Sequence, residues 1–400
     1  MSKEGKMRIA WTSNAPWTPT GYGVQTSEIV PLIAADGHEI AIMANYGLGG
    51  SPIEWNGIPV MPTGLDSYSN DVTPGQIGKW FQGNDKIPAL AMTLYDVWVY
   101  TAQAWDEFPI ACWTPIDHKG LPIAVAAWFN RRKNAKYAIA MSKFGEQELL
   151  EAKIPKDDIF YAPHSYNPNI YKVQESAMRK DLQVPDDAHL TMVNSANKGN
   201  NPVRKSWSEM LAAWAEWANG RKDAFIYIHT ESEGIASGVN LPTLLNALGV
   251  SPEQVRFAPQ LEYRMNIPAP TIASLYAASD VLLMPSRGEG FGVPLIESQA
   301  CGTPVITTDW TAMTELCGAG WLVEGQKEFD HHQGGWWKVP FISSIKDALQ
   351  ASYELKRDTA AALAMREKAA DFAKGYATPV VWENNWRPIL AELERRLTKK

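Results

Sequence analysis

The most informative segment of this sequence is Ser286-Arg-Gly-Glu-Gly-Phe-Gly-Val-Pro-Leu-Ile-Glu297. It follows the apolar run Val281–Pro285, which predicts a buried strand. Glycines at 288, 290 and 292 allow a tight turn close to a ligand, and Pro294 suits the first turn of a helix. A strand, a glycine-rich loop and a helix in this order predict a parallel α/β sheet with an anion site at the start of the helix.

Two carboxylates frame this loop. Glu289 lies on the loop itself, and Glu297 lies about one turn into the expected helix. A carboxylate repels phosphate, so we expect each of these acids to accept hydrogen bonds from hydroxyl groups. A phosphate site between two hydroxyl-binding acids describes a nucleotide sugar, with its ribose, diphosphate and hexose. The alternative, a structural loop with solvated glutamates, is less favoured because the glycines, the proline and the acids fall in one short run.

The same alternation of strand and helix extends outward over the chain, which at 400 residues suits two domains of about 150–200 residues each. Expected strands are Met7–Trp11, His38–Ala44, Ala89–Tyr95, Ile110–Thr114, Tyr137–Met141, His189–Asn194, Ala224–His229, Val255–Ala258, Val281–Pro285 and Pro304–Thr308. Expected helices are Val24–Asp36, Ser142–Leu150, Ser206–Asn219, Ile272–Ala278, Pro294–Ala300 and Val380–Leu397.

Prolines at 163, 168 and 185 interrupt this regularity and mark a domain boundary. We predict an N-terminal, acceptor-side Rossmann-like domain over 1–175 and a C-terminal, nucleotide-sugar-binding Rossmann-like domain over 176–378. A last helix within 379–400 is expected to return to the N-terminal domain. Two doubly wound domains of this kind are expected to face each other across a cleft, with the ligand at the carboxyl ends of both sheets.

Composition excludes several classes. The net charge of −7 argues against indiscriminate nucleic-acid or membrane binding. The polar N-terminus does not resemble a signal peptide, and no segment is apolar for about 18 residues, so we expect a cytoplasmic protein without a transmembrane segment. The three cysteines, Cys112, Cys301 and Cys317, are far apart, which argues against a disulfide framework or a zinc site. No Asp-x-Asp motif follows a strand, so no metal is expected.

The 286–297 segment resembles the paired-glutamate motif of retaining glycosyltransferases with the GT-B fold, the family typified by sucrose synthase and glycogen synthase. The two glutamates have seven residues between them, as in that motif. The resemblance implies that Glu289 approaches the donor sugar and that Glu297 binds the ribose. It also implies that the intervening backbone holds sugar and diphosphate, at Gly290, Phe291, Gly292, Val293, Pro294 and Leu295. A phage-type member of the family stays open.

Other segments extend this resemblance. Gly21-Tyr-Gly23 is similar to the family's first glycine loop, under the donor phosphates, which implicates Gly21 and Gly23. Val203-Arg-Lys-Ser206 is similar to the basic pair that contacts the diphosphate, here Arg204 and Lys205. Fixed cations there would stabilise the charge that grows on the diphosphate as the sugar leaves.

One segment departs from the family pattern. Where the family often has His-Asp, this chain has Asp117-His118, and either side chain could face the sugar.

The resemblance implies transfer of a hexose from a nucleotide diphosphate sugar, with a UDP-sugar favoured, and with retention at the anomeric carbon. The donor is the only small molecule expected, and no further cofactor is required. The residues expected in catalysis are Glu289, Arg204, Lys205, Asp117 and His118. Two rival functions stay open: a nucleotide-sugar-binding protein without transfer activity, and a phosphorylase or epimerase of the same fold.

The acceptor is not identified by these motifs. Between His118 and Gly145 there is no acid, but there are several cations, including Arg131, Arg132, Lys133 and Lys136. This basic zone favours a polyanion such as DNA carrying hydroxymethylated bases, although a lipid-linked glycan, a protein side chain, or simply an exposed helix end stay open.

Tryptophans add two further expectations. Trp207, Trp214 and Trp217 are predicted to pack in a core, because they fall in a helical pattern. The loop Asp330–Trp337 is interpreted as an insertion that lies on the surface or contacts the acceptor.

Overall fold

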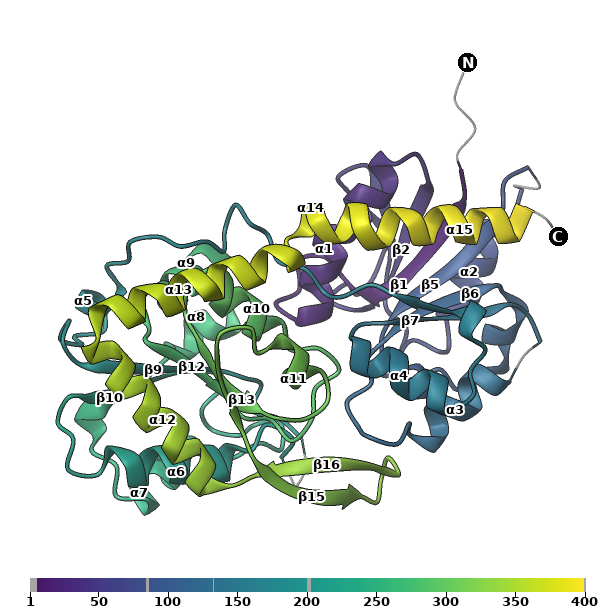
Figure 1. Ribbon diagram of the computed structural model, residues 1–400. Helices are drawn as coiled ribbons and strands as arrows, with labels where there is room; N and C mark the ends of the chain where they lie inside the picture. Colours follow the sequence, from purple (N-terminus) through teal and green to yellow (C-terminus); the bar gives the residue numbers. More distant parts are fainter. Residues whose placement is uncertain (1–5, 84–85, 132, 200–202, 399–400) are drawn as a thin grey trace. The chain divides into compact units, whose positions relative to one another are not determined.

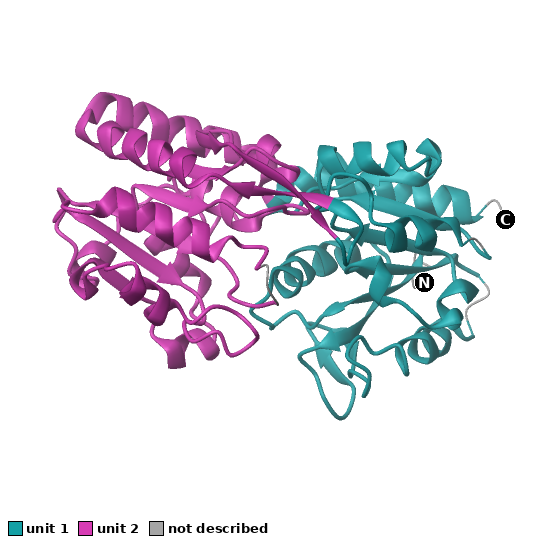
Figure 2. Ribbon diagram, turned by 90° about the horizontal axis from the view of Figure 1, so that it is seen from below, with its two compact units in different colours: residues 1–165, 331–335, 378–400 teal, residues 166–330, 336–377 magenta. Residues whose placement is uncertain are grey.

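The computed structural model describes residues 6–83, 86–131, 133–199 and 203–398 (Figure 1). The chain divides into two compact units, coloured separately in Figure 2. Unit 1 comprises Met1–Ser165, His331–Gly335 and Thr378–Lys400, and unit 2 comprises Tyr166–Asp330 and Trp336–Ala377. The C-terminal segment therefore groups with the N-terminal part of the chain.

Unit 1 is built on a sheet that contains eight strands among the described residues. The spatial order is β3-β4-β2-β1-β5-β6-β7-β8, and every pair is parallel except β3 with β4. The strand order reverses between β1 and β5, which makes this the switch point of a doubly wound sheet. The strands are β1 Arg8–Asn14, β2 Glu39–Tyr46, β3 Ile53–Trp55, β4 Ile58–Met61, β5 Ala89–Leu94, β6 Ile110–Thr114, β7 Lys136–Ala140 and β8 Ile159–Tyr161.

The central strands of this sheet are buried along almost their whole length, since helices cover both faces of a parallel sheet. The helices of unit 1 are α1 Gly21–Ala35, α2 Thr73–Phe81, α3 Ile123–Asn130, α4 Lys143–Glu151, α14 Thr378–Val381 and α15 Arg387–Thr398, with a π-helical turn Trp382–Trp386 before α15. Ser142 caps α4, as the sequence predicts, and its hydroxyl accepts the Gly145 amide at 2.9 Å.

Helix α1 begins earlier than we expected from the sequence. Its N-cap is Thr20, whose hydroxyl accepts the amide of Gly23 at 3.1 Å. The prediction that Gly21-Tyr-Gly23 forms a loop before a helix starting at Val24 was therefore wrong, because the Thr20 cap turns these residues into the first helical turn. A single loop thus connects the carboxyl end of β1 to the N-terminus of α1.

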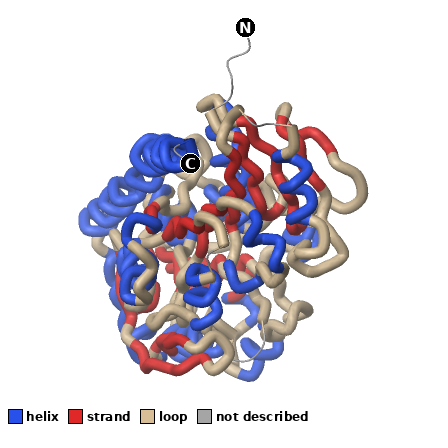
Figure 3. The backbone as a smooth tube through the Cα atoms, turned by 90° about the vertical axis from the view of Figure 1, so that its right-hand side faces the viewer, coloured by secondary structure: helices blue, strands red, loops and turns tan. Residues whose placement is uncertain are grey.

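Unit 2 repeats the doubly wound plan with six parallel strands among its described residues, in the order β11-β10-β9-β12-β13-β14. The order reverses between β9 and β12, so this is the switch point of the second sheet. Figure 3 distinguishes strands from helices in both units. The strands are β9 His189–Asn194, β10 Ala224–His229, β11 Val255–Phe257, β12 Val281–Met284, β13 Val305–Thr308 and β14 Gly320–Val323.

The core of unit 2 forms where helices pack on this sheet. Trp207, Trp214 and Trp217 lie on one helix and are almost fully buried, so the prediction that they pack in a core is confirmed. The helices of the unit are α5 Met178–Asp181, α6 Trp207–Ala218, α7 Leu241–Ala247, α8 Gln260–Arg264, α9 Ala269–Ala278, α10 Val293–Ala300, α11 Ala312–Leu316, α12 Ile342–Arg357 and α13 Thr359–Ala373.

A separate two-stranded hairpin follows the second sheet (Figure 1). Its strands are β15 Gly325–Asp330 and β16 Gly335–Pro340. The stretch interpreted from the sequence as an inserted loop, Asp330–Trp337, is therefore the turn of this hairpin together with the ends of its strands.

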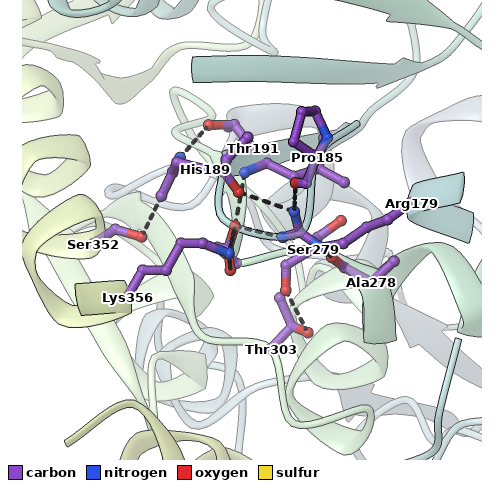
Figure 4. Close-up of polar contacts among 12 residues, drawn as sticks. Arg179, Pro185, His189, Thr191, Ala278, Ser279, Thr303, Ser352 and Lys356 are labelled. Atoms are coloured by element: carbon purple, nitrogen blue, oxygen red, sulfur yellow. Dashed lines mark hydrogen bonds and ion pairs between the residues drawn. The ribbon is translucent and has the colours of Figure 1, made fainter. Parts of the chain in front are cut away.

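An ionic cluster lies at the amino ends of β9 and β12 (Figure 4). Asp280 immediately precedes β12, and its carboxylate accepts hydrogen bonds from Arg179 Nη2 at 2.7 Å and from Lys356 Nζ at 2.9 Å. It also accepts the amide of Leu190 at 2.7 Å. Burial alone would raise the pKa of Asp280, but the neighbouring positive charges and this amide lower it below its usual value.

His189 completes the cluster. Its Nε2 lies 2.9 Å from the hydroxyl of Ser352. A dashed line marks this contact in Figure 4. Burial lowers the pKa of His189 to about 4, so the ring is neutral at physiological pH. The cluster ties α5 and α12 to the amino end of the sheet, which leaves the carboxyl end for the loops that carry the candidate site.

Candidate active site

The predicted cations and the predicted acid come together at the switch point of unit 2. Arg204 and Lys205 lie on the connection between β9 and α6, and Glu289 lies on the connection between β12 and α10. Because β9 and β12 are neighbouring parallel strands, these loops emerge side by side at the carboxyl ends of the strands. Ligands of doubly wound sheets bind at this position.

Both cations bind the same carboxylate. Arg204 Nη1 lies 2.7 Å from Glu289 Oε2 and also donates to the carbonyl of Gly288 at 2.6 Å. Lys205 Nζ pairs with the other carboxylate oxygen of Glu289. Burial would raise the pKa of Glu289, but the charges of Arg204 and Lys205 prevail and lower it to about 2. The acid is therefore ionised throughout the physiological pH range, between two fixed cations.

Two residues with left-handed backbones hold this arrangement in place, and neither was predicted from the sequence as part of the site. Ser206, next to Lys205, has a φ of 52°, and Thr311 also has a φ of 52°. The hydroxyl of Thr311 accepts the amide of Glu289 at 3.0 Å. Such conformations cost non-glycine residues about 1–3 kcal/mol each and concentrate at functional sites. No sequence signal marks a threonine or serine for this conformation.

The loop then enters α10 through Gly292, which is the N-cap and has a φ of 113°. This conformation favours glycine. The first turn of α10 contains Val293, Pro294 and Leu295, and a helix start of this kind directs its amides toward an anion. Gly290 precedes this turn, and Phe291 is buried with its ring centroid 5.8 Å from that of Tyr376.

The second predicted acid, Glu297, is buried on α10. The hydroxyl of Tyr276 donates to Glu297 Oε2 at 3.3 Å, and Asn194 Nδ2 donates to that hydroxyl at 2.7 Å. Burial raises the pKa of Glu297 to about 7, although hydrogen bonds from Tyr171 and Tyr276 oppose the shift. The sequence did not predict Asn194 or Tyr276, since only the fold brings β9 and α9 to this carboxyl.

The remaining predicted site residues lie in unit 1. Gly23 packs tightly, because a Cβ there would lie 2.1 Å from Thr18 Oγ1, whereas Gly21 has open space around its Cα. Asp117 and His118 follow β6, and His118 Nδ1 lies 2.7 Å from Asp117 Oδ1. His118 is buried, and the half-buried carboxylate of Asp117 orients its ring.

The basic zone predicted for a polyanionic acceptor is corrected by the structure. Lys136 is buried, and its Nζ donates to Asp106 Oδ1 at 2.8 Å, so it cannot contact an acceptor. Arg131 pairs with the other oxygen of Asp106 at 2.8 Å. Lys133 pairs with Glu107 at 2.6 Å.

Asp106 and Glu107 precede the acid-free stretch in the sequence and lie on the 3₁₀ turn Gln103–Glu107. From this turn they neutralise the cations of the basic zone with which they pair. The fourth predicted cation, Arg132, lies outside the described residues.

Residues 202–331 match the family model described as "Glycosyl transferases group 1". Arg204, Lys205, Glu289 and Glu297 all fall within this match. This segment is similar to group 1 glycosyltransferases.

Curated relatives of this chain include the D-inositol 3-phosphate glycosyltransferase of Paenarthrobacter aurescens, 36% identical over 108 residues, which are 26% of this chain and 25% of the relative. The enzyme of the same name from Thermobispora bispora is 30% identical over 163 residues, 40% of this chain and 36% of the relative. The chain thus matches only about a quarter to a third of the length of these relatives.

Solved glycosyltransferase structures match the whole chain in fold. Sucrose-phosphate synthase from Thermosynechococcus elongatus superposes with a TM-score of 0.71 at 18% identity, covering 98% of both chains. Anabaena Alr3699/HepE, solved in complex with UDP-glucose, superposes with a TM-score of 0.65 at 15% identity, covering 96% of this chain and 98% of the other. With the parallel sheets described above, these matches confirm the predicted α/β fold of the GT-B type.

Among the described residues, we find no helix that combines the length and apolar character needed to cross a bilayer. Within the same residues, no group of three or more His, Cys, Asp or Glu side chains is arranged to hold a metal ion.

Proposed function

We propose that this chain is a glycosyltransferase that moves a hexose from a nucleotide diphosphate sugar, a UDP-sugar by preference, to an acceptor hydroxyl with retention at the anomeric carbon. One observation carries the proposal: Arg204 and Lys205 converge on Glu289 at the switch point of unit 2. A pair of cations, a hydroxyl-accepting carboxylate and a helix start meet there, and a nucleotide sugar needs all three.

In this proposal the donor interacts with four side chains of unit 2. Arg204 and Lys205 exchange part of their contact with Glu289 for the diphosphate and stabilise its growing charge as the sugar leaves. Glu289 then accepts hydrogen bonds from hydroxyls of the donor sugar, and Glu297 accepts them from the ribose. The backbone from residue 290 to 295 contributes amides to the sugar and the diphosphate, at Gly290, Phe291, Gly292, Val293 and Leu295, with Pro294 shaping the turn.

Residues of unit 1 are assigned by the family resemblance. Gly21 and Gly23 belong to the turn proposed to lie under the donor phosphates, and Asp117 and His118 are proposed to contact the donor sugar. The hydrogen bond between Asp117 and His118 favours a role for the pair as a unit, with the acid orienting the ring. A UDP donor is supported by Alr3699/HepE, which was solved with UDP-glucose.

DNA is not retained as the acceptor, because three of the four cations that favoured it, Arg131, Lys133 and Lys136, are paired with Asp106 or Glu107. The alternative function is a nucleotide-sugar-binding protein without transfer activity. Turnover of the donor distinguishes an enzyme from such a protein. We expect the protein to release UDP from at least one of UDP-glucose, UDP-galactose and UDP-N-acetylglucosamine, followed by a coupled UDP assay. Binding of these donors with no release of UDP would favour the binding protein, and absence of binding would reject both functions.

A further inference from the structure

The hairpin β15–β16 exposes aromatic rings on one of its faces. Phe329 on β15 is 38% exposed and Trp336 on β16 is 43% exposed. Their ring centroids lie 5.1 Å apart at an interplanar angle of 65°. Trp310 lies beside them, and its indole Nε1 donates to the carbonyl of Trp336 at 3.2 Å. We call these three residues the hairpin platform.

Strand alternation places two lysines on the same face. Lys327 lies two residues before Phe329, and Lys338 lies two residues after Trp336, so both point to the side of the platform. Their ammonium groups lie 5.6 and 5.2 Å from the centroid of Trp310, within the range of a cation–π interaction. This face therefore combines aromatic rings with the ammonium group of Lys327, whereas Lys338 Nζ donates to the carbonyl of Asp309.

The opposite face of the hairpin is fixed to the body of unit 2. Glu328, between Lys327 and Phe329, pairs with Arg287 Nη1 at 2.9 Å, while Arg287 Nη2 pairs with Glu209 of α6 at 2.8 Å. The carbonyl of Arg287 also accepts the amide of Lys338 at 2.9 Å. Since Arg287 lies two residues before Glu289, the hairpin is bound to the loop of the candidate active site.

A second connection leads from the platform to the same acid. Trp310 directly precedes Thr311, whose hydroxyl accepts the amide of Glu289 at 3.0 Å. The chain therefore connects the platform, through Thr311, to the loop that carries Glu289, which we assign to the donor sugar. Transfer must occur at the sugar end of a donor, so an acceptor has to bind close to it.

We propose that the hairpin platform is a subsite for a carbohydrate acceptor, with a pyranose ring stacked on Trp336 beside Phe329. This inference rests on the proposed function and names its acceptor class. The C–H face of a sugar ring is apolar and packs on an aromatic ring, while its hydroxyls accept hydrogen bonds from lysine.

A membrane surface is the other class of partner that aromatic rings and lysines could serve. Binding to anionic lipid typically uses about 4–8 clustered basic residues. The platform has two lysines, and Lys338 is further engaged with the carbonyl of Asp309 at 2.8 Å and lies 3.6 Å from Glu324. The charge on this face therefore favours a neutral carbohydrate.

The test measures binding of three neutral hexasaccharides, maltohexaose, cellohexaose and mannohexaose, by ligand-observed NMR. We expect at least one to bind the unaltered protein, and Trp336→Ala to weaken that binding at least about tenfold. Trp98→Ala is the matched control, since Trp98 is a similarly exposed tryptophan of unit 1 at 39%, and it should leave binding unchanged. Phe329→Ala is a second variant that should weaken binding in the same direction.

Failure to bind any of the three sugars, or equal binding by Trp336→Ala, would overturn the inference. So would binding to phosphatidylglycerol vesicles that Trp336→Ala abolishes while sugar binding is unaffected. Release of UDP from the donor is measured on the same samples, because the platform variants should keep it. Normal UDP release together with unaltered sugar binding in Trp336→Ala rejects only the proposed subsite. Absence of UDP release in every sample, including the unaltered protein, rejects the proposed function.

Discussion

Arg204 Nη1 lies 2.7 Å from Glu289 Oε2, so the cation expected to hold the donor diphosphate is bound to the acid expected to hold the donor sugar. Lys205 shares the same carboxylate. A diphosphate entering this site competes with Glu289 for both cations. The pair therefore links binding of the phosphates to release of the carboxylate, which can then accept hydrogen bonds from the sugar.

Because of this competition, we expect Glu289→Gln to have opposite effects on UDP binding and on turnover of the donor. Glutamine keeps the shape of the side chain but removes the charge, so Arg204 and Lys205 become more available to a phosphate. We expect free UDP to bind more tightly, by about tenfold or more, since a charge-assisted contact is worth about 1.5–3 kcal/mol. Turnover of the donor should fall. Calorimetry with UDP measures the first effect.

A matched control is Glu209→Gln, which removes an acid that pairs with Arg287 instead. It should leave UDP affinity unchanged. Weaker binding of UDP by a correctly folded Glu289→Gln variant would show that Arg204 and Lys205 do not hold the phosphates.

Replacing both cations should affect the reaction more than binding. In Arg204→Ala with Lys205→Ala, the charge that is lost opposes a negative charge that is larger in the transition state than in the ground state. We expect kcat to fall by about 10²–10³, with a smaller change in donor affinity. Steady-state kinetics over a range of donor concentrations measures the change in kcat separately from the change in donor affinity. Normal kcat at saturation combined with a collapse of donor affinity would mean that these cations only bind.

Glu297 should make donor binding depend on pH. Its pKa is raised to about 7 by burial, so it becomes protonated as the pH falls below neutrality and stops accepting both ribose hydroxyls. Tyr276 and Cys301 beside it stay neutral in this range, because burial also raises the pKa of Tyr276 and brings that of the Cys301 thiol to about 12.

We therefore expect affinity for UDP-glucose to fall as the pH drops below 7 and to level off at a total loss of about tenfold, once Glu297 is fully protonated. UDP-glucose is the appropriate ligand because its diphosphate does not titrate there. Glu297→Gln should bind about tenfold more weakly at pH 8 and lose this pH dependence. An unchanged pH profile in Glu297→Gln would assign the titration to another group.

The candidate site was predicted from the sequence where its signals are local. Glycines, a proline and two acids in one short run identify the loop from residue 286 to 297, and the basic pair at 204–205 was predicted by resemblance. The structure brings Arg204, Lys205 and Glu289 together, since β9 and β12 are neighbours in the sheet. The fold class was predictable for a similar reason, because buried parallel strands are continuous apolar runs.

What the sequence could not predict depends on tertiary contacts. The cations of the basic zone looked unopposed because Asp106 and Glu107 lie before it in the chain and reach it only through folding. Thr311 and Tyr276 carry no motif, and their roles follow from a left-handed backbone and a buried hydrogen bond. The hairpin was interpreted as a loop because His331–Gly335 has the composition of a turn and gives no sign of the short strands on either side of it.

The ionic cluster at the other end of the sheet predicts how stability depends on pH. The pKa of His189 is lowered to about 4 by burial, whereas an unfolded histidine titrates near about 6.5. The unfolded state therefore binds more protons between these values, and stability present above pH 6.5 is lost as the pH falls toward 4. The full loss from this one group is about 3 kcal/mol.

Urea unfolding at pH 7.5 and pH 4.5 measures this loss. His189→Gln should show a smaller decrease in stability between the two pH values than the unaltered protein. The control His331→Gln changes an exposed histidine and should retain the full decrease. Equal decreases in the unaltered protein and in His189→Gln would exclude His189 as a source of the acid sensitivity.

The central claim is that this chain transfers a sugar from a nucleotide donor with retention at the site formed by Arg204, Lys205 and Glu289. The most direct measurement is time-resolved proton NMR of α-linked UDP-glucose, UDP-galactose and UDP-N-acetylglucosamine, each incubated with the protein, which follows donor consumption and the anomer that forms first. We predict that at least one donor is consumed, that the first sugar released or transferred is the α-anomer, and that Arg204→Ala with Lys205→Ala abolishes this signal. First formation of the β-anomer, or no consumption of any donor, would contradict the account.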